Sequence, residues 1–273
     1  MRIALIQMNV TSDKKDNLFC TEEKVKRAAD MGADIAILPE MFCCPYTNES
    51  FIENAEPCQG NIWNTMSKLA KGNNIYIVAG SIPESDNGKI YNTSFVFNRA
   101  GEQIARHRKL HLFDINIEGG QRFFESDTFT PGDCITTFET EFCTLGLCIC
   151  FDMRFPEVSR LMTLNGARVI IAPAAFNMTT GPAHWEILFR QRAVDNQIFT
   201  IGVAPARDVK AEYVSYGNSI ICSPWGTVLK RAGCEEEMVV HDINLEDINS
   251  IRAQLPLLKA RRNDIYDIME VSK

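Results

Sequence analysis

Cys150 is the leading candidate for a nucleophile because of the place it occupies between two elements. It ends the apolar run that begins at Thr144 and is followed by a sequence that opens a helix. A nucleophile at such an elbow lies exposed at a sheet edge, beside backbone N–H groups that can hold an oxyanion. We expect the helix N-terminus to lower the pKa of the thiol and to favour the thiolate. The alternative is a small buried filler, which is what most free cysteines are.

Glu40 and Lys109 are candidate partners of this nucleophile. Glu40 follows the apolar strand 35–38, and open α/β sheets place ligands at the carboxyl ends of strands. Partial burial there raises a carboxyl pKa toward that of a usable base. The alternative is that Glu40 is an ordinary loop glutamate with no catalytic role. Lys109 is followed by Leu110 and Leu112, so its strand enters the interior, where an ammonium can stabilise a thiolate or an oxyanion. A solvated strand face is the alternative for Lys109.

The other cysteines and the histidines raise two questions. One is whether the thiols bind a metal, and the other is whether a histidine is the partner of Cys150. Ten cysteines are present without a C-x-x-C pair, and neither Cys43–Cys44 nor the C-x-C of 148–150 has a second half with zinc spacing. We therefore expect free thiols and no metal site. Four histidines leave a Cys–His dyad open, with His184 as the most obvious partner. The histidines are His107, His111, His184 and His241.

Length and composition are those of an ordinary globular protein. The chain has 273 residues, of which 45% are apolar and 23% are charged, so disorder is not expected. No apolar run approaches the roughly 18 residues of a membrane span. The net charge of -7 repels a phosphate backbone, which argues against a nucleic-acid partner. The N-terminal segment MRIALIQMNV predicts a first strand and not an export signal, so we expect a cytoplasmic protein.

Strand-length apolar runs alternate with helical patterns, which favours an α/β layered fold. The segments 31–40 and 165–175 share the pattern G-A-x-[IV]-x-I-x-P, so we expect two related βαβ halves whose sheets face each other. No Ser/Gly linker separates the halves, and we expect a single domain over residues 1–273. The predicted strands are 2–8, 34–38, 75–80, 90–97, 103–109, 142–150, 168–172, 199–205 and 239–243, with a hairpin through 223–226. The predicted helices are one through Leu18, Val25 and Ala28 that ends at Met31–Gly32, then 61–71, 156–164, one from Gly181, and 248–255.

Three blocks, in this order, resemble the signature blocks of the nitrilase superfamily of carbon–nitrogen hydrolases. They are Leu-Pro-Glu at 38–40, Arg-Lys-Leu-His at 108–111 and Cys-Ile-Cys-Phe-Asp-Met-Arg-Phe-Pro-Glu at 148–157, and the likeness runs from residue 2 to about 267. The segments 109–114, 175–186 and 193–197 resemble the ω-amidase branch in particular. The resemblance implies a four-layer α-β-β-α sandwich built from two similar halves.

The resemblance also implies roles for individual residues. Cys150 corresponds to the family's nucleophile, Glu40 to its general base and Lys109 to the lysine that stabilises the oxyanion. The second glutamate of the family corresponds to Glu125, which without the resemblance is interpreted as a surface loop carboxylate. The backbone N–H of Phe151 is expected to share in binding the oxyanion.

The substrate side of the site follows from the ω-amidase resemblance. In that branch, groups matching Arg154, Phe176 and Thr180 bind the distal carboxylate of a dicarboxylate monoamide. An arginine fork suits bidentate binding of a carboxylate, although a salt bridge from Arg154 to Glu157 is the simpler alternative. The implied reaction is hydrolysis of the terminal amide of 2-oxoglutaramate and 2-oxosuccinamate, through a cysteine thioester, to ammonia and the 2-oxo acid. No cofactor is implied, and His184 becomes a structural or pocket-wall residue.

Two other functions stay open. A sister branch that cleaves deaminated glutathione shares Asp-Met-Arg-Phe-Pro-Glu and Thr-Gly-Pro-Ala-His-Trp-Glu, whereas the segments 177–179 and 193–196 favour the ω-amidase. A non-catalytic, thiol-rich binding or redox-sensing protein belongs to a different class, but such proteins usually lose a catalytic group. Relatives in the superfamily form dimers, so we expect a homodimer. The tail at about 256–273, with Lys-Ala-Arg-Arg at 259–262, is expected at a surface or subunit contact.

Overall fold

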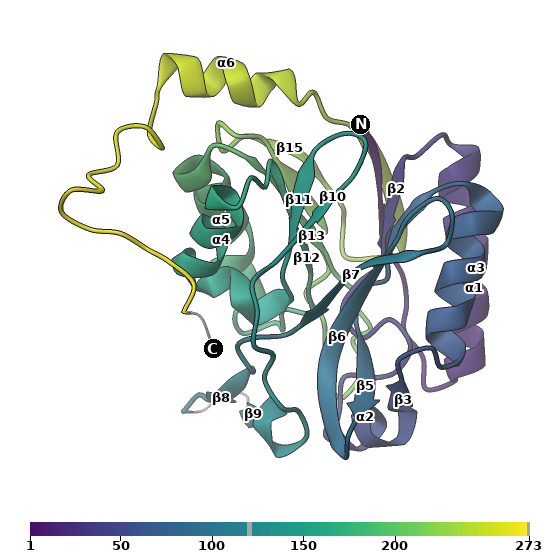
Figure 1. The fold of residues 1–273 in the computed structure, drawn as a ribbon. Coiled ribbons are helices and arrows are strands. Elements are labelled where there is room, and N and C mark those ends of the chain that lie inside the picture. The colour runs from purple at the N-terminus through teal and green to yellow at the C-terminus, as the bar shows by residue number, and fades with distance from the viewer. Residues whose placement is uncertain (119–121, 272–273) are drawn as a thin grey trace.

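Two β-sheets face each other, and helices cover the outer side of each (Figure 1). A computed structural model describes residues 1–118 and 122–271 of the chain. In the first sheet the strand order is β16-β1-β2-β4-β6-β5-β3, with β7 paired to β6; in the second it is β10-β11-β12-β13-β14-β15; β8 and β9 form a separate pair.

Most strands of both sheets are short. The first sheet contains β1 (Arg2–Gln7), β2 (Ile35–Ile37), β3 (Glu56–Pro57), β4 (Tyr76–Val78), β5 (Ile82–Asp86), β6 (Lys89–Phe97), β7 (Gln103–Arg108) and β16 (Glu237–Asp242). The second contains β10 (Thr136–Glu139), β11 (Thr144–Leu147), β12 (Val169–Pro173), β13 (Phe199–Val203), β14 (Ile220–Cys222) and β15 (Val228–Arg231), and the small pair is β8 (Asp114–Asn116) with β9 (Arg122–Phe124). The α-helices are α1 (Lys14–Asp30), α2 (Asn48–Asn54), α3 (Asn61–Asn73), α4 (Pro156–Leu164), α5 (Gly181–Asn196) and α6 (Glu246–Gln254), and the 3₁₀ turns are η1 (Glu125–Asp127) and η2 (Cys150–Arg154).

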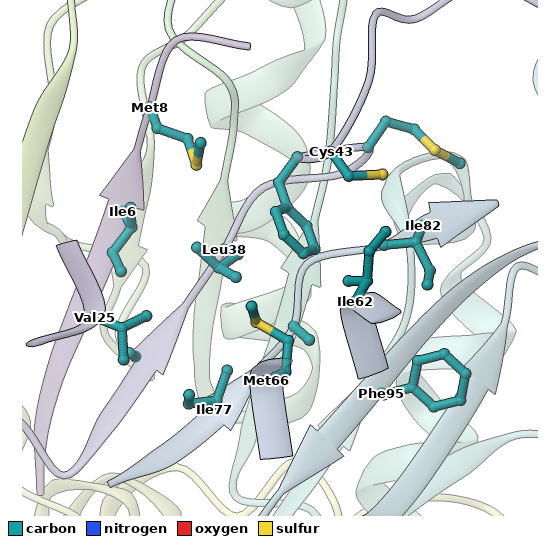
Figure 2. Close-up of a cluster of buried hydrophobic side chains, with 14 of the residues drawn as sticks. Ile6, Met8, Val25, Leu38, Cys43, Ile62, Met66, Ile77, Ile82 and Phe95 are labelled. Carbon is teal, nitrogen blue, oxygen red and sulfur yellow. The ribbon is translucent and has the colours of Figure 1, made fainter. Parts of the chain in front are cut away.

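Helices α1 and α3 cover the outer face of the first sheet. Figure 2 shows the cluster between them, in which Ile6, Leu38 and Ile77 from the sheet side lie with Val25 of α1 and Met66 of α3. All five side chains are buried. Burying one apolar stripe of each helix in this way supplies most of the stability that a helix has in a protein.

The inner faces of the two sheets form a second buried cluster. Ile3 and Leu5 of β1 lie in it, together with Val169 and Ile171 of β12. The strand residues between these positions, Ala4 and Ile170, lie in the clusters on the helix sides of the two sheets instead. Both faces of each central strand are therefore buried, which is why these strands are continuous apolar runs in the sequence and not alternating ones.

Helices α4 and α5 complete the fourth layer by covering the second sheet. Met162 of α4 and Trp185 and Phe189 of α5 lie in one buried cluster on that side. A Cβ at Gly202 of β13 would lie 2.4 Å from Cζ of Phe189, so the glycine allows α5 to pack directly on the strand. The four-layer α-β-β-α expectation is confirmed.

The two halves are built alike, as the shared pattern predicted. β2 lies between β1 and β4 and is parallel to both, and β12 lies between β11 and β13 and is parallel to both. The segments 31–40 and 165–175 therefore supply corresponding strands of the two sheets. The loops beyond these two strands differ, however, and this difference decides which groups each half contributes to the site.

Several predicted strands are shorter than expected: 34–38 is found as Ile35–Ile37, 75–80 as Tyr76–Val78 and 199–205 as Phe199–Val203. The strand predicted at 142–150 ends at Leu147, and Cys150 is the first residue of the turn η2. The cause is local, because the backbone N–H of Ile149 donates to Oδ2 of Asp152 (3.0 Å) and no longer follows the strand. Helix 156–164 is found with the predicted bounds, whereas α2, β3 and the pair β8–β9 were not predicted.

The C-terminal tail leaves the sandwich after α6 and runs past the side that carries α4 and α5 (Figure 1). Nδ2 of Asn165, at the end of α4, donates to Glu270 of the tail (2.7 Å). The tail exposes Ile265, Met269 and Val271 by 69%, 72% and 88%. Its last two residues, 272–273, lie outside the described part of the chain. Over residues 1–118 and 122–271, the structure contains no helix with the length and apolar character of a membrane span.

Candidate active site

Glu40 lies in a sharply bent loop just beyond the C-terminal end of β2. The loop is held by Ser81, whose N–H donates to the carbonyl of Pro39 (3.3 Å) and whose Oγ accepts from the N–H of Met41 (3.2 Å). Gly80, with a φ of +45°, lies against the same carbonyl, and a Cβ there would be 2.0 Å from it. Met41 itself has a φ of 53°, which is uncommon for a residue with a side chain. This bend places the Glu40 side chain inside the protein with no exposed surface.

Lys109 follows β7, and its backbone is held on both sides. Its N–H donates to the carbonyl of Asn92 (2.8 Å), and its carbonyl accepts from the N–H of Gly132 (2.8 Å). The side chain is fully buried, and Nζ lies 2.9 Å from Oε1 of Glu40 and 2.8 Å from Oε1 of Glu125. Lys109 is therefore an interior ammonium shared by two carboxylates, and not part of a solvated strand face.

Glu125 opens the turn η1 and is buried, so its interpretation as a surface loop carboxylate is wrong. Its Oε2 accepts from the N–H of Phe113 (2.7 Å) while Oε1 accepts from Lys109. Its own N–H donates to the carbonyl of Phe113 (3.3 Å). The double contact with one backbone residue fixes the direction in which Glu125 meets the lysine.

Cys150 has a left-handed backbone, with a φ of 46°, and is 4% exposed. A strained backbone conformation at a non-glycine residue is found most often at functional sites. Burial and the negative charge of Glu40 raise the pKa of the thiol well above its ordinary value, and Lys109 only partly offsets them. The expectation that a helix end lowers this pKa is wrong, because in the resting site burial outweighs the favourable charges.

Asp152 connects the turn that Cys150 opens to the segment that carries Lys109, and it was not predicted. Its Oδ2 accepts from Nε2 of His107 (3.0 Å) in addition to Ile149, and its Oδ1 accepts from both N and Nδ1 of His111 (each 2.9 Å). Burial acts to raise the pKa of Asp152, but these donors outweigh it and hold the pKa well below its usual range. His107 and His111 flank Lys109 in the chain, so the anion holds the lysine segment against the cysteine turn.

The hydrogen bonds and the ion pair of Glu40 are all made by one carboxylate oxygen, Oε1. Oε1 lies 2.9 Å from Nδ2 of Asn92 and 3.1 Å from the hydroxyl of Tyr46, in addition to Lys109. Oε2 is buried and has no hydrogen-bond donor in the described residues. Neither Asn92 nor Tyr46 was predicted. The arrangement leaves Oε2 as the oxygen that is open to take a proton.

The charges of this cluster set its pKa values. Burial raises the pKa of Glu40, Lys109 lowers it and Glu125 raises it again, with a net increase. For Lys109, burial acts to lower the pKa, but the two carboxylates outweigh it and hold the pKa well above the ordinary value. The lysine is thus a permanent cation at neutral pH, and Glu40 is a stronger base than a solvated carboxylate.

Arg154 ends the turn that Cys150 begins and lies among the predicted carboxylate-binding residues. Its Cζ lies 4.7 Å from the ring centre of Phe176, and Nη1 lies 3.0 Å from Nδ1 of His184. Thr180, buried at the start of α5, hydrogen-bonds to Oδ1 of Asn177 (2.9 Å). The ion pairs of residues 1–118 and 122–271 do not include Arg154, so the alternative of a salt bridge to Glu157 is wrong.

His184 hydrogen-bonds to Arg154, and the partners of the other histidines are also residues other than Cys150. His107 and His111 bind Asp152, and His241 lies on β16. His184 therefore lies beside Arg154. All ten cysteines are free thiols. The described part of the chain contains no group of three or more His, Cys, Asp or Glu side chains that could hold a metal ion.

A cavity of about 810 Å³ opens beside the carboxylate cluster. Glu40, Tyr46, Ala175 and Tyr213 are among the residues that line it. Cys150 is not a lining residue, but its thiol interacts with Glu40 and with the backbone of Ala175, both of which are. The four buried groups therefore lie just behind the cavity wall. Arg154 is not a lining residue either, but its guanidinium interacts with Cys150 and with Tyr213, which lines the cavity.

Known proteins resemble this chain in sequence and in fold. Residues 2–253 match the family model described as carbon-nitrogen hydrolase. Omega-amidase NIT2 of Mus musculus is 48% identical over 267 residues, and that of Homo sapiens is 46% identical over 267 residues; each match covers 98% of this chain and 97% of the relative. The crystal structure of Saccharomyces cerevisiae Nit3, a member of branch 10 of the nitrilase superfamily, superposes with a TM-score of 0.89 at 38% identity and 96% coverage of both chains. Sequence and fold agree over nearly the whole length, and the chain belongs to the carbon-nitrogen hydrolase family.

Proposed function

We propose that this carbon-nitrogen hydrolase is an ω-amidase that hydrolyses the terminal amide of 2-oxoglutaramate and 2-oxosuccinamate to ammonia and the 2-oxo acid. The observation that carries the substrate assignment is Arg154. It is half-buried, Nε has no hydrogen-bond partner in the described structure, and no carboxylate of residues 1–118 or 122–271 pairs with it. A substrate carboxylate supplies the missing partner, while Phe176 and Thr180 form the walls around it.

Acylation of Cys150 is the first half of the proposed reaction. Oε2 of Glu40 takes the thiol proton as Sγ attacks the amide carbon, and the carbonyl oxygen becomes an oxyanion. Nζ of Lys109 and the backbone N–H of Phe151 bind that oxyanion, each donor contributing about 10²–10³-fold to the rate. Glu40 then gives its proton to the amide nitrogen, the C–N bond breaks, and ammonia leaves with a thioester on Cys150.

Hydrolysis of the thioester returns the enzyme to its resting state. Glu40 takes a proton from water as the water oxygen attacks the thioester carbon, and Lys109 again binds the oxyanion. The C–S bond breaks, the thiolate takes the proton back from Glu40, and the 2-oxo acid leaves. Glu125 keeps Lys109 in place throughout, because its own position is fixed by two contacts with Phe113.

Two alternatives are less well supported. The deaminated glutathione amidase is not favoured, because the relatives at 46–48% identity over nearly the whole chain are omega-amidases. A non-catalytic thiol protein does not require four buried groups to converge, yet Glu40, Lys109, Glu125 and Cys150 contact one another away from solvent.

Replacing Arg154 with leucine tests the substrate assignment. We expect kcat/KM for 2-oxoglutaramate to fall by about 10–100-fold, since a hydrogen bond to a charged group contributes roughly 1.5–3 kcal/mol. Hydrolysis of butyramide, which has no carboxylate, should change little. Ammonia release measures both. Arg190→Leu, which removes a surface arginine paired with Glu186, is the control. An equal loss on both amides would contradict a carboxylate-binding role, and a native protein inactive on 2-oxoglutaramate would contradict the proposed function.

We further infer a homodimer in which the C-terminal tail lies at the subunit interface. The support is the row of exposed apolar side chains at Ile265, Tyr266, Met269 and Val271, which a monomer would leave in water. Sedimentation velocity of the full chain should give the mass of a dimer, and replacing Ile265 and Met269 with serine should shift the distribution toward the monomer. A native chain that sediments only as a monomer would overturn this inference.

The proposed location is the cytoplasm. Ten free thiols, among them a nucleophile, persist best in a reducing compartment. Recovery of the protein mainly in a secreted or membrane fraction would contradict this location.

A further inference from the structure

The hydroxyl of Tyr46 lies between the two carboxylates of the site. Its oxygen is 2.5 Å from Oε1 of Glu125, 3.1 Å from Oε1 of Glu40 and 3.4 Å from Nζ of Lys109. A phenol has one proton to donate, so it makes a full hydrogen bond to one carboxylate and only a partial one to the other. The shorter distance places that proton mainly on the Glu125 side of the resting site.

The cluster needs a donor that adds no charge of its own. With both glutamates ionised, Glu40, Glu125 and Lys109 together carry one surplus negative charge, and all three side chains are buried. A surplus of this kind favours uptake of a proton by one of the carboxylates. Burial and Glu125 already raise the pKa of Glu40. A protonated Glu40 is unable to accept the proton of Cys150.

The position of the hydroxyl is fixed by the ring that carries it. The Tyr46 ring stacks on Tyr213 at 4.4 Å and meets the edge of Phe51 at 5.1 Å and the tilted ring of Phe123 at 5.6 Å. Burial and the neighbouring carboxylates raise the pKa of Tyr46 well above its ordinary value, so the phenol keeps its proton. The hydroxyl is therefore a fixed, neutral donor at every pH at which the enzyme works.

We propose that Tyr46 is a positioning residue whose hydroxyl stabilises the ionised form of the Glu40–Glu125 pair and so keeps Glu40 able to act as the base. The inference rests on the proposed role of Glu40. When Glu40 takes the thiol proton, the Tyr46 O–H donates to Glu125 alone; when Glu40 returns that proton, the original sharing resumes. Tyr46 loses and gains no proton in the cycle.

One of the ionisable groups that face the pair supplies a matched control. Lys109, Cys150, Tyr46 and Tyr213 surround Glu40 and Glu125. The Tyr213 hydroxyl donates to the carbonyl of Ala175 (2.5 Å) and not to a carboxylate. Tyr46→Phe and Tyr213→Phe therefore each remove one oxygen from the same stacked pair of rings, but only the first removes a donor to the glutamates.

The test is the acidic limb of two pH profiles measured on the full chain. The first is the rate at which iodoacetamide alkylates Cys150, located by peptide mass, and the second is kcat/KM for ammonia release from 2-oxoglutaramate. Losing a donor to the carboxylate form raises its pKa, so in Tyr46→Phe both limbs should move up by about one pH unit. The rates on the limb then fall about tenfold at a given pH. Glu40→Gln identifies the limb, because the limb should be absent in that variant.

The outcomes separate Tyr46 from a general effect and from the proposed function. An unmoved limb in Tyr46→Phe overturns the inference, and so does an equal shift in Tyr213→Phe. A shift in Tyr46→Phe alone supports it. Alkylation requires no substrate, so a native protein that is inactive on 2-oxoglutaramate refutes the proposed substrate while the alkylation profile still decides the role of Tyr46. A thermal unfolding curve for each variant checks that the limbs are compared between folded proteins.

Discussion

Alanine in place of Cys150 is expected to lower kcat/KM for ammonia release from 2-oxoglutaramate by about 10⁵-fold or more, as loss of a covalent nucleophile typically does. The reason is that Glu40 and Lys109 are arranged around the sulfur, and neither can form the acyl intermediate without it. The fold should persist, because removing one sulfur from a 4% exposed site leaves only a small cavity. Serine at the same position should be nearly as inactive, since Glu40 is too weak a base for an alcohol.

Cys148 is the matched control for this substitution. It lies two residues earlier, is also fully buried, and its Sγ is 3.9 Å from the carbonyl of Ile171 on β12. Cys148→Ala should therefore release ammonia within a few-fold of the native rate. Mass spectrometry of the native protein quenched during turnover should find the acyl group on Cys150. Turnover by Cys150→Ala within tenfold of native, or an acyl group on another cysteine, would contradict the thioester mechanism.

Methionine in place of Lys109 is expected to remove activity and stability together. The substitution leaves Oε1 of Glu40 and Oε1 of Glu125 facing each other in a buried site without the ammonium that now lies 2.9 Å and 2.8 Å from them. Removing one partner of a buried ion pair typically costs about 3–5 kcal/mol, and the oxyanion loses a donor as well. We expect a loss of at least about 10³-fold in kcat/KM and a lower free energy of unfolding in urea.

The pH dependence of this loss follows from the two carboxylates. In the native protein burial raises the pKa of Glu40 and Lys109 partly offsets this effect. Without Lys109 the folded-state pKa of Glu40 rises further above that in the unfolded chain, so the folded variant binds more protons than the unfolded one. Its stability relative to the native protein should therefore recover as the pH falls and worsen as the pH rises. The double variant Lys109→Met with Glu125→Gln should regain part of the stability but not the activity, because one unpaired carboxylate is gone while the oxyanion donor is still absent. A destabilisation independent of pH would show that the ion pairs are not its cause.

Local patterns were sufficient to predict the layers and to mark Glu40, Lys109 and Cys150 as candidate site residues, whereas their roles came from the family resemblance. Continuous apolar runs mark strands that are buried on both faces, and the G-A-x-[IV]-x-I-x-P pattern marks β2 and β12, which occupy corresponding places in the two sheets. Glu40 and Cys150 each stand where such a run ends, and Lys109 stands where a polar strand gives way to Leu110 and Leu112; both features are visible within a few residues of sequence. Pro156 at the first position of α4 marks the start of that helix, because the N–H that proline lacks has no partner within the helix at that position.

Contacts between distant segments decided the rest. Tyr46 meets Glu125 across 79 residues of sequence, Asp152 meets His111 across 41, and no local pattern specifies either pair. The same limit explains the wrong pKa direction for Cys150. A helix end is a local feature that a sequence reveals, whereas burial depends on which distant segments pack over the thiol, and here burial and Glu40 outweigh the favourable charges. Sequence patterns were therefore enough to predict which residue types stand at the ends of strands. How those groups share protons depends on the fold, because a charge in a protein responds to neighbours that the chain brings together by folding.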